Sequence, residues 1–427
     1  MCDSIVAAPS QTADGGSLYA KNSDRTSGEC QPFVQFPAAY YARDARVRCT
    51  HLAIPQVAET FSVMGHSPWW VWGFEHGVNE HAVAIGNHTV FSKEPIEIQP
   101  GLIGMDLVRL GLERANSARE AVEVIAGLVE RHGQGGAAFA PEASGYHNSF
   151  VVVDAKEGWQ LETSNRRWAA RRVDLAAVSN HLSIRTDWEI GAGDLERFAV
   201  AEGWWPGDER LDVASAYRNP HVPAHVSAGR QRRATELLNA SAGRHDVASF
   251  AGILRDHADG GPVWMGGDAT PEDERYFTLC AHSEPVHGTT ASLIAALPAD
   301  PSLPWPVWIS FGTPCTGIFL PVYLHGVVPP ALARGVEAPE PDSAWWVFAR
   351  LQEAASAAPA VSTPRLRAAW AELESEFEAE RSGVEAAARA SLEARAPDAA
   401  AAELSGFMAR CTDRVLARAT DLVAAAC

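Results

Sequence analysis

Residues 1–25 read MCDSIVAAPSQTADGGSLYAKNSDR and contain two short runs rich in strand-forming residues. The first run is SIVAAP and the second is SLYAKNS, with TADGG between them. Aspartate and glycine tolerate the backbone angles of tight turns, so this segment predicts a β-hairpin. The same stretch holds a cysteine at position 2 and a cluster of polar residues at the end of the second run. These reactive and polar residues make the hairpin a candidate for a functional site.

Cys2 has two interpretations. If Met1 is removed, Cys2 carries both a thiol and a free α-amine. Such an amine titrates at about 7.7–8.0, so its neutral form can take the thiol proton near physiological pH. One residue is then nucleophile and base together, as in the N-terminal nucleophile type of acyl transfer. If Met1 stays, Cys2 is a small residue near a chain end.

The polar cluster KNSDR offers three side chains for such a site. Lys21 can place a positive charge beside a thiolate, and Asp24 can hold the α-amine by accepting its protons. Arg25 can support Asp24 or bind a substrate carboxylate. A solvated turn with a salt bridge explains the same residues without any catalytic role.

Two asparagines stand where apolar strands end. Asn87 follows the run AVAIG, and Asn180 lies in VSNHLSI. A side-chain amide at such a point can donate a hydrogen bond to a developing oxyanion. Because asparagine is common in loops, neither residue is evidence by itself.

The chain beyond residue 25 alternates between strand-rich and helix-rich parts. Ser117 and Glu120 fit a helical capping box, and Gly133 fits a helix end. This pattern predicts antiparallel sheets sandwiched by helices. A Pro-rich break suggests two parts, a main domain over 2–335, which would hold any catalytic site, and an Ala/Glu-rich helical extension over 343–427. The order is strands to about 100, helices in 102–132, a three-strand meander in 149–173, helices in 225–260, strands to about 325, and helices from 343.

Composition excludes several classes of function. The formal charge is −18, from 35 Lys and Arg against 53 Asp and Glu, so phosphate-bearing nucleic acid and anionic membranes are unfavourable partners. No GxGxxG or GxxxxGK[ST] motif is present, which argues against nucleotide binding. No run approaches the roughly 18 apolar residues of a membrane span. The N-terminal residues lack the basic and apolar segments of a secretory leader, so we expect a cytoplasmic protein.

The cysteines suggest neither a disulfide framework nor a metal site. The seven cysteines are odd in number and scattered, and none forms a CxxC pair. We therefore expect reduced thiols, no metal and no cofactor. Cys280 and His282 in LCAH are an alternative thiol–imidazole pair of the papain type, in which Cys2 would play no part.

Several motifs, in consistent order over residues 2 to about 325, resemble the secernins of the C69 family of dipeptidase-like proteins. They are MCDSIVAAPSQTADGGSLYAKNSDR, WWVWGFEHGVNEHAVAIGN, LIGMDLVRLGLERA, GQGG, YHNSFVVVDAKEGWQLET and VSNHLSI. The resemblance implies an α+β fold, the αββα four-layer sandwich of antiparallel sheets of the N-terminal nucleophile (Ntn) hydrolases. It also implies amide hydrolysis by an N-terminal cysteine, as in the more distant choloylglycine hydrolases and penicillin V acylases.

The resemblance also implies roles for individual residues. Cys2 matches the family nucleophile, and Asp24 in KNSDR matches the aspartate that holds its amine. Asn180 in SNHLS matches the oxyanion asparagine, and Asn87 in IGN falls where the acylases have a second oxyanion donor. Lys21 stands where the acylases usually have arginine, and the two are not interchangeable at a two-pronged contact. The late arginine of the acylases has no evident counterpart in the sequence.

We expect a cysteine-type Ntn hydrolase that cleaves an amide bond, most simply a dipeptidase. Two alternatives stay open: an N-acyl amide or lactam acylase with a Trp-lined pocket at 69–72, and a catalytically silent scaffold. The expected partner is a small peptide or amide substrate, with no nucleic acid and no membrane. The sequence leaves a homo-oligomer open.

Overall fold

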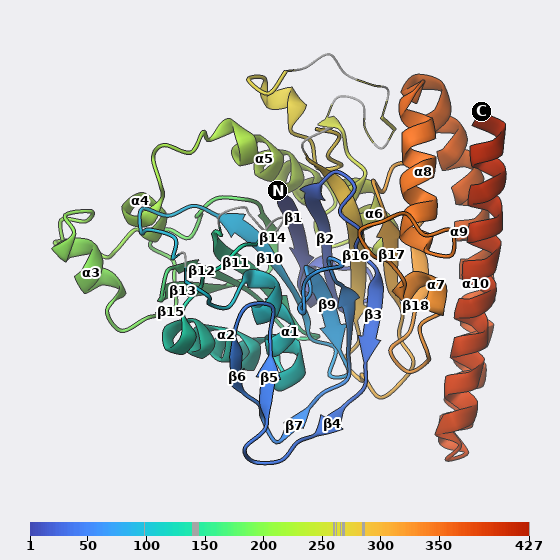
Figure 1. Ribbon diagram of the computed structural model, residues 1–427, viewed down its shortest axis with the longest axis horizontal. Coiled ribbons are helices and arrows are strands. Elements are labelled where there is room, and N and C mark those ends of the chain that lie inside the picture. Colours follow the sequence, from blue (N-terminus) through green and yellow to red (C-terminus); the bar gives the residue numbers. More distant parts are fainter. Residues whose placement is uncertain are drawn as a thin grey trace.

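The computed structural model describes residues 1–426 apart from 98, 139–144, 259, 260, 262, 265, 267–269 and 284–286. Two antiparallel sheets, of six and eight strands, form the centre of the molecule, and helices lie around them (Figure 1). None of the described helices is both long enough and apolar enough to cross a membrane.

The six-stranded sheet is built around the predicted hairpin. Its strands lie in the order β14 (Leu175–Val178), β1 (Cys2–Ala7), β2 (Ser17–Thr26), β16 (His287–Leu297), β17 (Val307–Phe311) and β18 (Leu320–Val322). β1 and β2 pair antiparallel with Cys2 opposite Ser23, so the hairpin prediction is confirmed. Cys2 is thus the first residue of a strand that has neighbours on both sides.

The eight-stranded sheet contains the predicted meander. Its strands lie in the order β15 (Ile190–Gly191), β13 (Arg167–Val173), β12 (Gly158–Ser164), β11 (His147–Val153), β10 (Ala84–Val90), β9 (His76–Asn79), β8 (Val63–His66) and β3 (Phe33–Phe36). β11, β12 and β13 pair in sequence order, as the meander requires.

The strands of β1 and β2 bury both faces, which explains why helices cover the outside of the sheet. Val6 and Tyr19 point into the layer between the two sheets, whereas Ile5 and Ala20 point the other way. This outer face packs against α5 (His225–Ala240) and α6 (Val247–Leu254).

Two further helices complete the sandwich. α1 (Gly104–Arg114) and α2 (Ala118–His132) share a hydrophobic cluster with the outer face of the eight-stranded sheet. The Ser117 side chain accepts a hydrogen bond from the Glu120 nitrogen, and Gly133 ends α2 with a φ of 71°, as the sequence predicts. Helices, sheet, sheet and helices therefore follow one another, which confirms the αββα four-layer sandwich.

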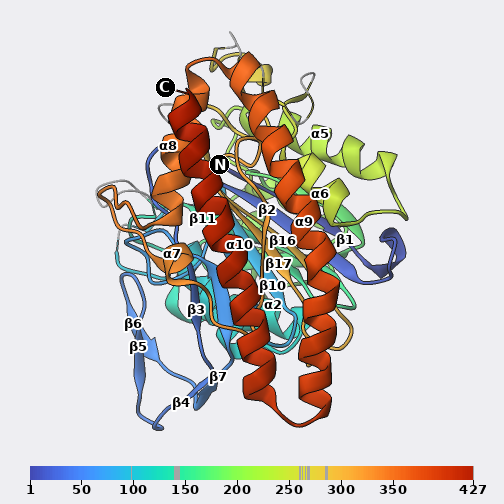
Figure 2. The ribbon, with the colours of Figure 1, turned by 90° about the vertical axis from the view of Figure 1, so that its right-hand side faces the viewer.

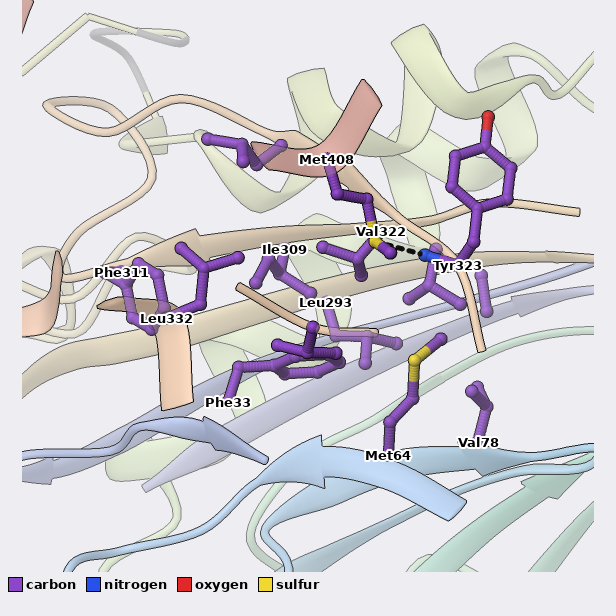
Figure 3. Close-up of a cluster of buried hydrophobic side chains, with 14 of the residues drawn as sticks. Phe33, Met64, Val78, Leu293, Ile309, Phe311, Val322, Tyr323, Leu332 and Met408 are labelled. Atoms are coloured by element: carbon purple, nitrogen blue, oxygen red, sulfur yellow. Dashed lines mark hydrogen bonds between the residues drawn. The ribbon is translucent and has the colours of Figure 1, made fainter. Parts of the chain in front are cut away.

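The C-terminal segment forms α8 (Ala344–Ser356), α9 (Pro359–Glu393) and α10 (Pro397–Ala426). α9 and α10 run side by side along one edge of the molecule (Figure 2). Figure 3 shows Met408 of α10 above Leu293 and Ile309 of the first sheet, and its sulfur accepts a hydrogen bond of 3.2 Å from the Tyr323 nitrogen. The helical extension therefore packs into the central cluster, and the division into 2–335 and 343–427 stays a prediction.

Short elements connect these layers. They are β4 (Ala39–Tyr40), β5 (Arg46–Arg48), β6 (Ala53–Pro55), β7 (Glu59–Thr60), α3 (Leu195–Ala201), α4 (Val213–Tyr217), α7 (Pro330–Ala333) and the 3₁₀ turns Pro9–Gln11 and Glu274–Tyr276.

Candidate active site around Cys2

The backbone nitrogen of Cys2 is held by Asn180. It donates a hydrogen bond of 2.8 Å to Asn180 Oδ1, across 178 residues of sequence. Asn180 comes two residues after β14, which pairs with β1, so the sheet itself brings the two residues together. Only 4% of Cys2 is exposed, and Asn180 is also buried. The predicted association of Asn180 with Cys2 therefore has a direct geometric basis.

Arg230 of α5 joins this pair. Its Nη2 donates to the same Asn180 Oδ1 at 2.7 Å, and its Nη1 lies 3.5 Å from the Cys2 carbonyl oxygen. Arg230 also forms a buried ion pair with Asp3. The Asn180 nitrogen donates to the Thr89 carbonyl at 3.0 Å, which accounts for one of its two protons. In this arrangement the oxygen of Asn180 faces Cys2, and one of its two N–H groups is bound to the Thr89 carbonyl.

The Cys2 thiol faces a buried carboxylate, Glu75, which follows the tryptophan-rich stretch at 69–72. Cys2 Sγ lies 3.9 Å from Glu75 Oε2, and Lys21 Nζ lies 3.0 Å from the same oxygen. Arg25 Nη1 lies 3.2 Å from Glu75 Oε1. The Cys2 thiol, Lys21 and Arg25 therefore all approach the same carboxylate, that of Glu75. Lys21 and Arg25 lie on the face of β2 that points between the sheets.

Burial and charge act in opposite directions on these groups. Burial alone raises the pKa of Glu75, but Lys21 and Arg25 outweigh it and hold that pKa below its ordinary value. Burial lowers the pKa of Lys21, yet the neighbouring Cys2 and Glu75 raise it overall. Burial raises the pKa of the Cys2 thiol, and Lys21 offsets only part of this effect. The thiol therefore needs a base to become a thiolate at neutral pH.

Asp24 lies on the other face of β2. Its Oδ1 accepts a hydrogen bond of 2.7 Å from Thr289 Oγ1, and its Oδ2 lies 3.8 Å from Arg230 Nη1. Its backbone nitrogen and oxygen pair with the oxygen and nitrogen of Met1, each at 2.9 Å. Asp24 thus borders the first residues of the chain, and the expected contact of its carboxylate with a Cys2 amine stays a prediction.

Asn87 of β10 reaches the site from the second sheet. One orientation of its amide donates to Asn148 Oδ1 at 3.1 Å. The opposite orientation donates to Glu75 Oε2 at 3.2 Å and to the Glu75 carbonyl at 3.1 Å. Asn87 therefore lies beside the same Glu75 that approaches Cys2.

The sequence did not single out Glu75 or Arg230. Glu75 is the one carboxylate in the run SPWWVWGFEHG. An isolated charge in such an apolar run is the feature of the sequence that could have indicated a functional role for Glu75. Arg230 lies in AGRQRRATELL, where neighbouring arginines gave no basis for choosing it. Arg25 also pairs with Glu29 through two hydrogen bonds of 2.7 and 2.9 Å, which the i, i+4 spacing permits but does not require.

A cavity of about 730 Å³ lies elsewhere, on the outer face of the first sheet, between α6 and α9. Its lining includes Arg255, Phe319, Trp308 and Arg381, and none of the six predicted site residues. The cluster around Cys2 is itself buried, with Lys21 fully buried and Cys2 4% exposed.

The chain is similar in sequence to known peptidases. Residues 1–189 match the family model described as Peptidase family C69. A dipeptidase of Bifidobacterium longum is 28% identical over 254 residues, which cover 52% of this chain and 45% of that protein. The chain thus spans about half the length of this curated relative.

Two solved structures are also similar. A C2A mutant of conjugated bile acid hydrolase from Clostridium perfringens has a TM-score of 0.44 and 14% identity, covering 73% of this chain and 89% of that one. Penicillin V acylase from Agrobacterium tumefaciens has a TM-score of 0.44 and 14% identity, covering 75% and 86%. The sequence match is confined to the N-terminal part: residues 1–189 of this chain are similar to peptidase family C69.

Proposed function

We propose that this protein is a cysteine-type Ntn hydrolase that cleaves an amide bond, most simply that of a dipeptide. Cys2 is the nucleophile once Met1 has been removed, and its own α-amine is the base. The contact between the Cys2 nitrogen and Asn180 Oδ1 at 2.8 Å is the observation that carries this proposal. The match to peptidase family C69 and the dipeptidase relative support it.

The first chemical step uses the two groups of Cys2. The neutral amine takes the proton of the buried thiol, and the sulfur forms a bond to the substrate carbonyl carbon. Asn180 Oδ1 orients the amine, and Asp24 balances the charge that the amine gains. Lys21 supplies a positive charge near the sulfur while it is a thiolate.

The carbonyl oxygen becomes an oxyanion in this step. The second N–H of Asn180 and the amide of Asn87 are the proposed donors to that oxygen. When the tetrahedral intermediate collapses, the C–N bond breaks and the leaving amine takes the proton from the Cys2 ammonium. Water then attacks the thioester, gives its proton to the Cys2 amine, and releases the acid and the thiol.

Arg230 is a positioning residue in this proposal. Arg230 Nη2 donates a hydrogen bond of 2.7 Å to Asn180 Oδ1 and so holds that oxygen in place. The ion pair with Asp3 orients the Arg230 guanidinium. The expected result of its loss is a misplaced Asn180 rather than a missing reactive group.

A second candidate function is an N-acyl amide acylase on the same site. The Trp70 indole donates to Glu29 at 2.5 Å, and Glu29 holds Arg25 beside the site. In that case Trp70 would contact the apolar acyl group.

The proposed location is the cytoplasm, as the sequence leads us to expect.

The test compares the untagged protein with its Cys2→Ala variant on dipeptides and N-acyl amides, after the intact mass has shown whether Met1 is absent. The dipeptidase proposal expects turnover of dipeptides that disappears in Cys2→Ala. Turnover of acyl amides alone favours the acylase. A folded protein with Cys2 at its N-terminus and no turnover of either class contradicts both and favours a scaffold.

A further inference from the structure

Outside the candidate active site, four histidine and cysteine side chains lie together at one end of the first sheet. They are His257, Cys280, His282 and Cys315, and one ligand atom from each lies within 4.8 Å of all the others. His257 follows α6, Cys280 and His282 precede β16, and Cys315 lies between β17 and β18. Three separate segments of the chain thus supply one cluster. No short motif in the sequence predicts it.

The distances within the cluster suit tetrahedral zinc. His282 Nε2 lies 3.2 Å from Cys315 Sγ and 3.6 Å from Cys280 Sγ. With Zn–S near 2.3 Å and Zn–N near 2.0–2.1 Å, neighbouring sulfur and nitrogen ligands are separated by about 3.6 Å in a tetrahedron. The 3.6 Å separation matches this value, the 3.2 Å separation is shorter, and all four ligand atoms lie within 4.8 Å of one another.

The hydrogen bonds of His257 prepare its ring for a metal. Its Nδ1 lies 2.9 Å from the Gly261 carbonyl, which can only accept, so Nδ1 carries the proton. The lone pair is then on Nε2, which is buried and has no hydrogen-bond partner in the part of the chain that the structure describes. A backbone carbonyl on the far nitrogen is the usual way a zinc-bound histidine is oriented.

Burial and charge also favour a divalent cation. His257, Cys280 and Cys315 are buried, and the His282 ring stacks on Trp264 with centroids 3.9 Å apart. Two thiolates and two neutral imidazoles make a zinc complex with no net charge, which a buried site accommodates at low cost. Two cysteines and two histidines without an open ligand position are typical of structural rather than catalytic zinc.

The backbone around the cluster is already tied together. The Cys280 nitrogen donates to the Asp256 carbonyl at 3.1 Å, next to His257. Arg255 Nε donates to the Pro314 carbonyl at 3.0 Å, next to Cys315. These contacts hold the three segments in place without depending on the four ligand side chains.

We propose that His257, Cys280, His282 and Cys315 bind a structural zinc ion. This assignment replaces the expectation that the chain has no metal site. The expectation rested on the absence of CxxC spacing, whereas here each ligand segment contributes only one or two residues. It also gives Cys280 and His282 a role other than a thiol–imidazole catalytic pair.

The zinc site adjoins the candidate active site through one threonine. The nitrogen of Ala281, which lies between two of the ligands, donates to Thr289 Oγ1 at 2.9 Å. Thr289 Oγ1 in turn donates to Asp24 Oδ1 at 2.7 Å. A zinc ion bound here would hold Ala281 in place, and through Thr289 it would help to orient the Asp24 carboxylate, which we propose binds the Cys2 amine.

The test measures zinc by elemental mass spectrometry in protein purified without a histidine tag. Wild type is expected to hold about one zinc per chain, and the variants Cys315→Ser and His257→Asn close to none. Cys411→Ser, at another buried cysteine on α10, is the matched control and keeps its zinc. Cys2→Ala also keeps its zinc, so this result does not depend on the proposed hydrolase activity.

A second measurement avoids dependence on variants that fold poorly. Wild-type protein loaded with Co²⁺ is expected to show a thiolate-to-cobalt charge-transfer band and the strong visible bands of a tetrahedral site. Wild-type protein that holds no zinc and gives no such spectrum after reduction overturns the proposal. A Cys280–Cys315 disulfide in protein purified without reductant, found by its mass, also overturns it.

Discussion

At the scale of single residues, the position of the Cys2 nitrogen beside Asn180 is the most informative contact. It joins two motifs that are 178 residues apart, and β1 and β14 place them as neighbouring strands. Sequence patterns and the family resemblance were enough to select both residues. They were not enough to find Glu75, because its role depends on Lys21 and Arg25 meeting it from another sheet.

The first residue-scale prediction concerns Asn180. Asn180→Ala removes one proposed oxyanion donor, so we expect kcat to fall by roughly 10²–10³, or about 2.7–4 kcal/mol. The KM should change far less, because the donor acts on charge that develops in the transition state. Steady-state kinetics on one dipeptide separates the two parameters. An unchanged kcat with a raised KM would instead make Asn180 a substrate-binding residue.

The second residue-scale prediction concerns Glu75 and its two cations. Glu75→Gln leaves Lys21 buried without its carboxylate, and breaking a buried pair in this way costs about 3–5 kcal/mol. Urea unfolding at neutral pH measures this loss. Adding Lys21→Met to Glu75→Gln should recover part of it, since no unpaired charge then remains.

Glu123→Gln is the matched control, because Glu123 forms an exposed pair with Arg119 and such pairs contribute little. If Glu75→Gln is no more destabilising than this control, the buried ion pairs do not stabilise the fold. The double variant then has nothing to recover.

The same carboxylate predicts how stability depends on pH. The pKa of Glu75 is lower in the folded protein than its ordinary value, mainly because Lys21 and Arg25 oppose the effect of burial. Its contribution to stability is therefore complete above the ordinary pKa of a glutamate, and it is lost as the pH falls through the folded value. Unfolding measured from neutral to acid pH should show this loss in wild type and a smaller one in Glu75→Gln. Parallel pH curves for the two proteins would contradict the assignment.

At the scale of elements, α5 connects the outer helical layer to the site through Arg230. The two-pronged guanidinium reaches Asn180 and Asp3 at once, which a lysine cannot do. The strands, the hairpin and the meander followed from residue patterns. The residue patterns did not predict which turn of α5 faces Cys2. The helix has several arginines, and only its packing against the sheet distinguishes Arg230 from the others.

We expect Arg230→Lys to keep the fold and to lower kcat more than it raises KM. Arg230→Gln should lower kcat further, and partial activity of the lysine variant would show that charge contributes beyond geometry. Arg244→Lys, at an exposed site after α5, is the control. If Arg230→Lys and Arg244→Lys have the same kcat, Arg230 does not position the site.

At the scale of the whole molecule, the helical extension packs on the sandwich rather than standing apart from it. Trp370 of α9 is fully buried, and its indole nitrogen donates to the Thr316 carbonyl at 2.8 Å. The Ala-rich composition of this segment predicted helices, which are present. It did not predict that Trp345, Trp370 and Met408 join the core between the sheets, since composition does not reveal a packing partner.

Trp370→Ala should destabilise the protein by about 3–5 kcal/mol through loss of buried surface and the cavity left behind. Because α9 shares its core with the sheets, far-UV circular dichroism and loss of activity should move together on heating. Val361→Ala, at an exposed position on the same helix, should leave both unchanged. Separate transitions for the helical signal and for activity would show that residues 343–427 unfold as an independent unit.

In the proposed mechanism, the decisive feature is that the α-amine of Cys2 acts as the base. Its most direct test is a chain with a removable leader that ends immediately before Cys2, assayed on one dipeptide before and after the leader is cleaved. We expect no turnover while the Cys2 nitrogen is part of a peptide bond, full turnover after cleavage, and none at either stage for Cys2→Ala. Equal turnover before and after cleavage would contradict it.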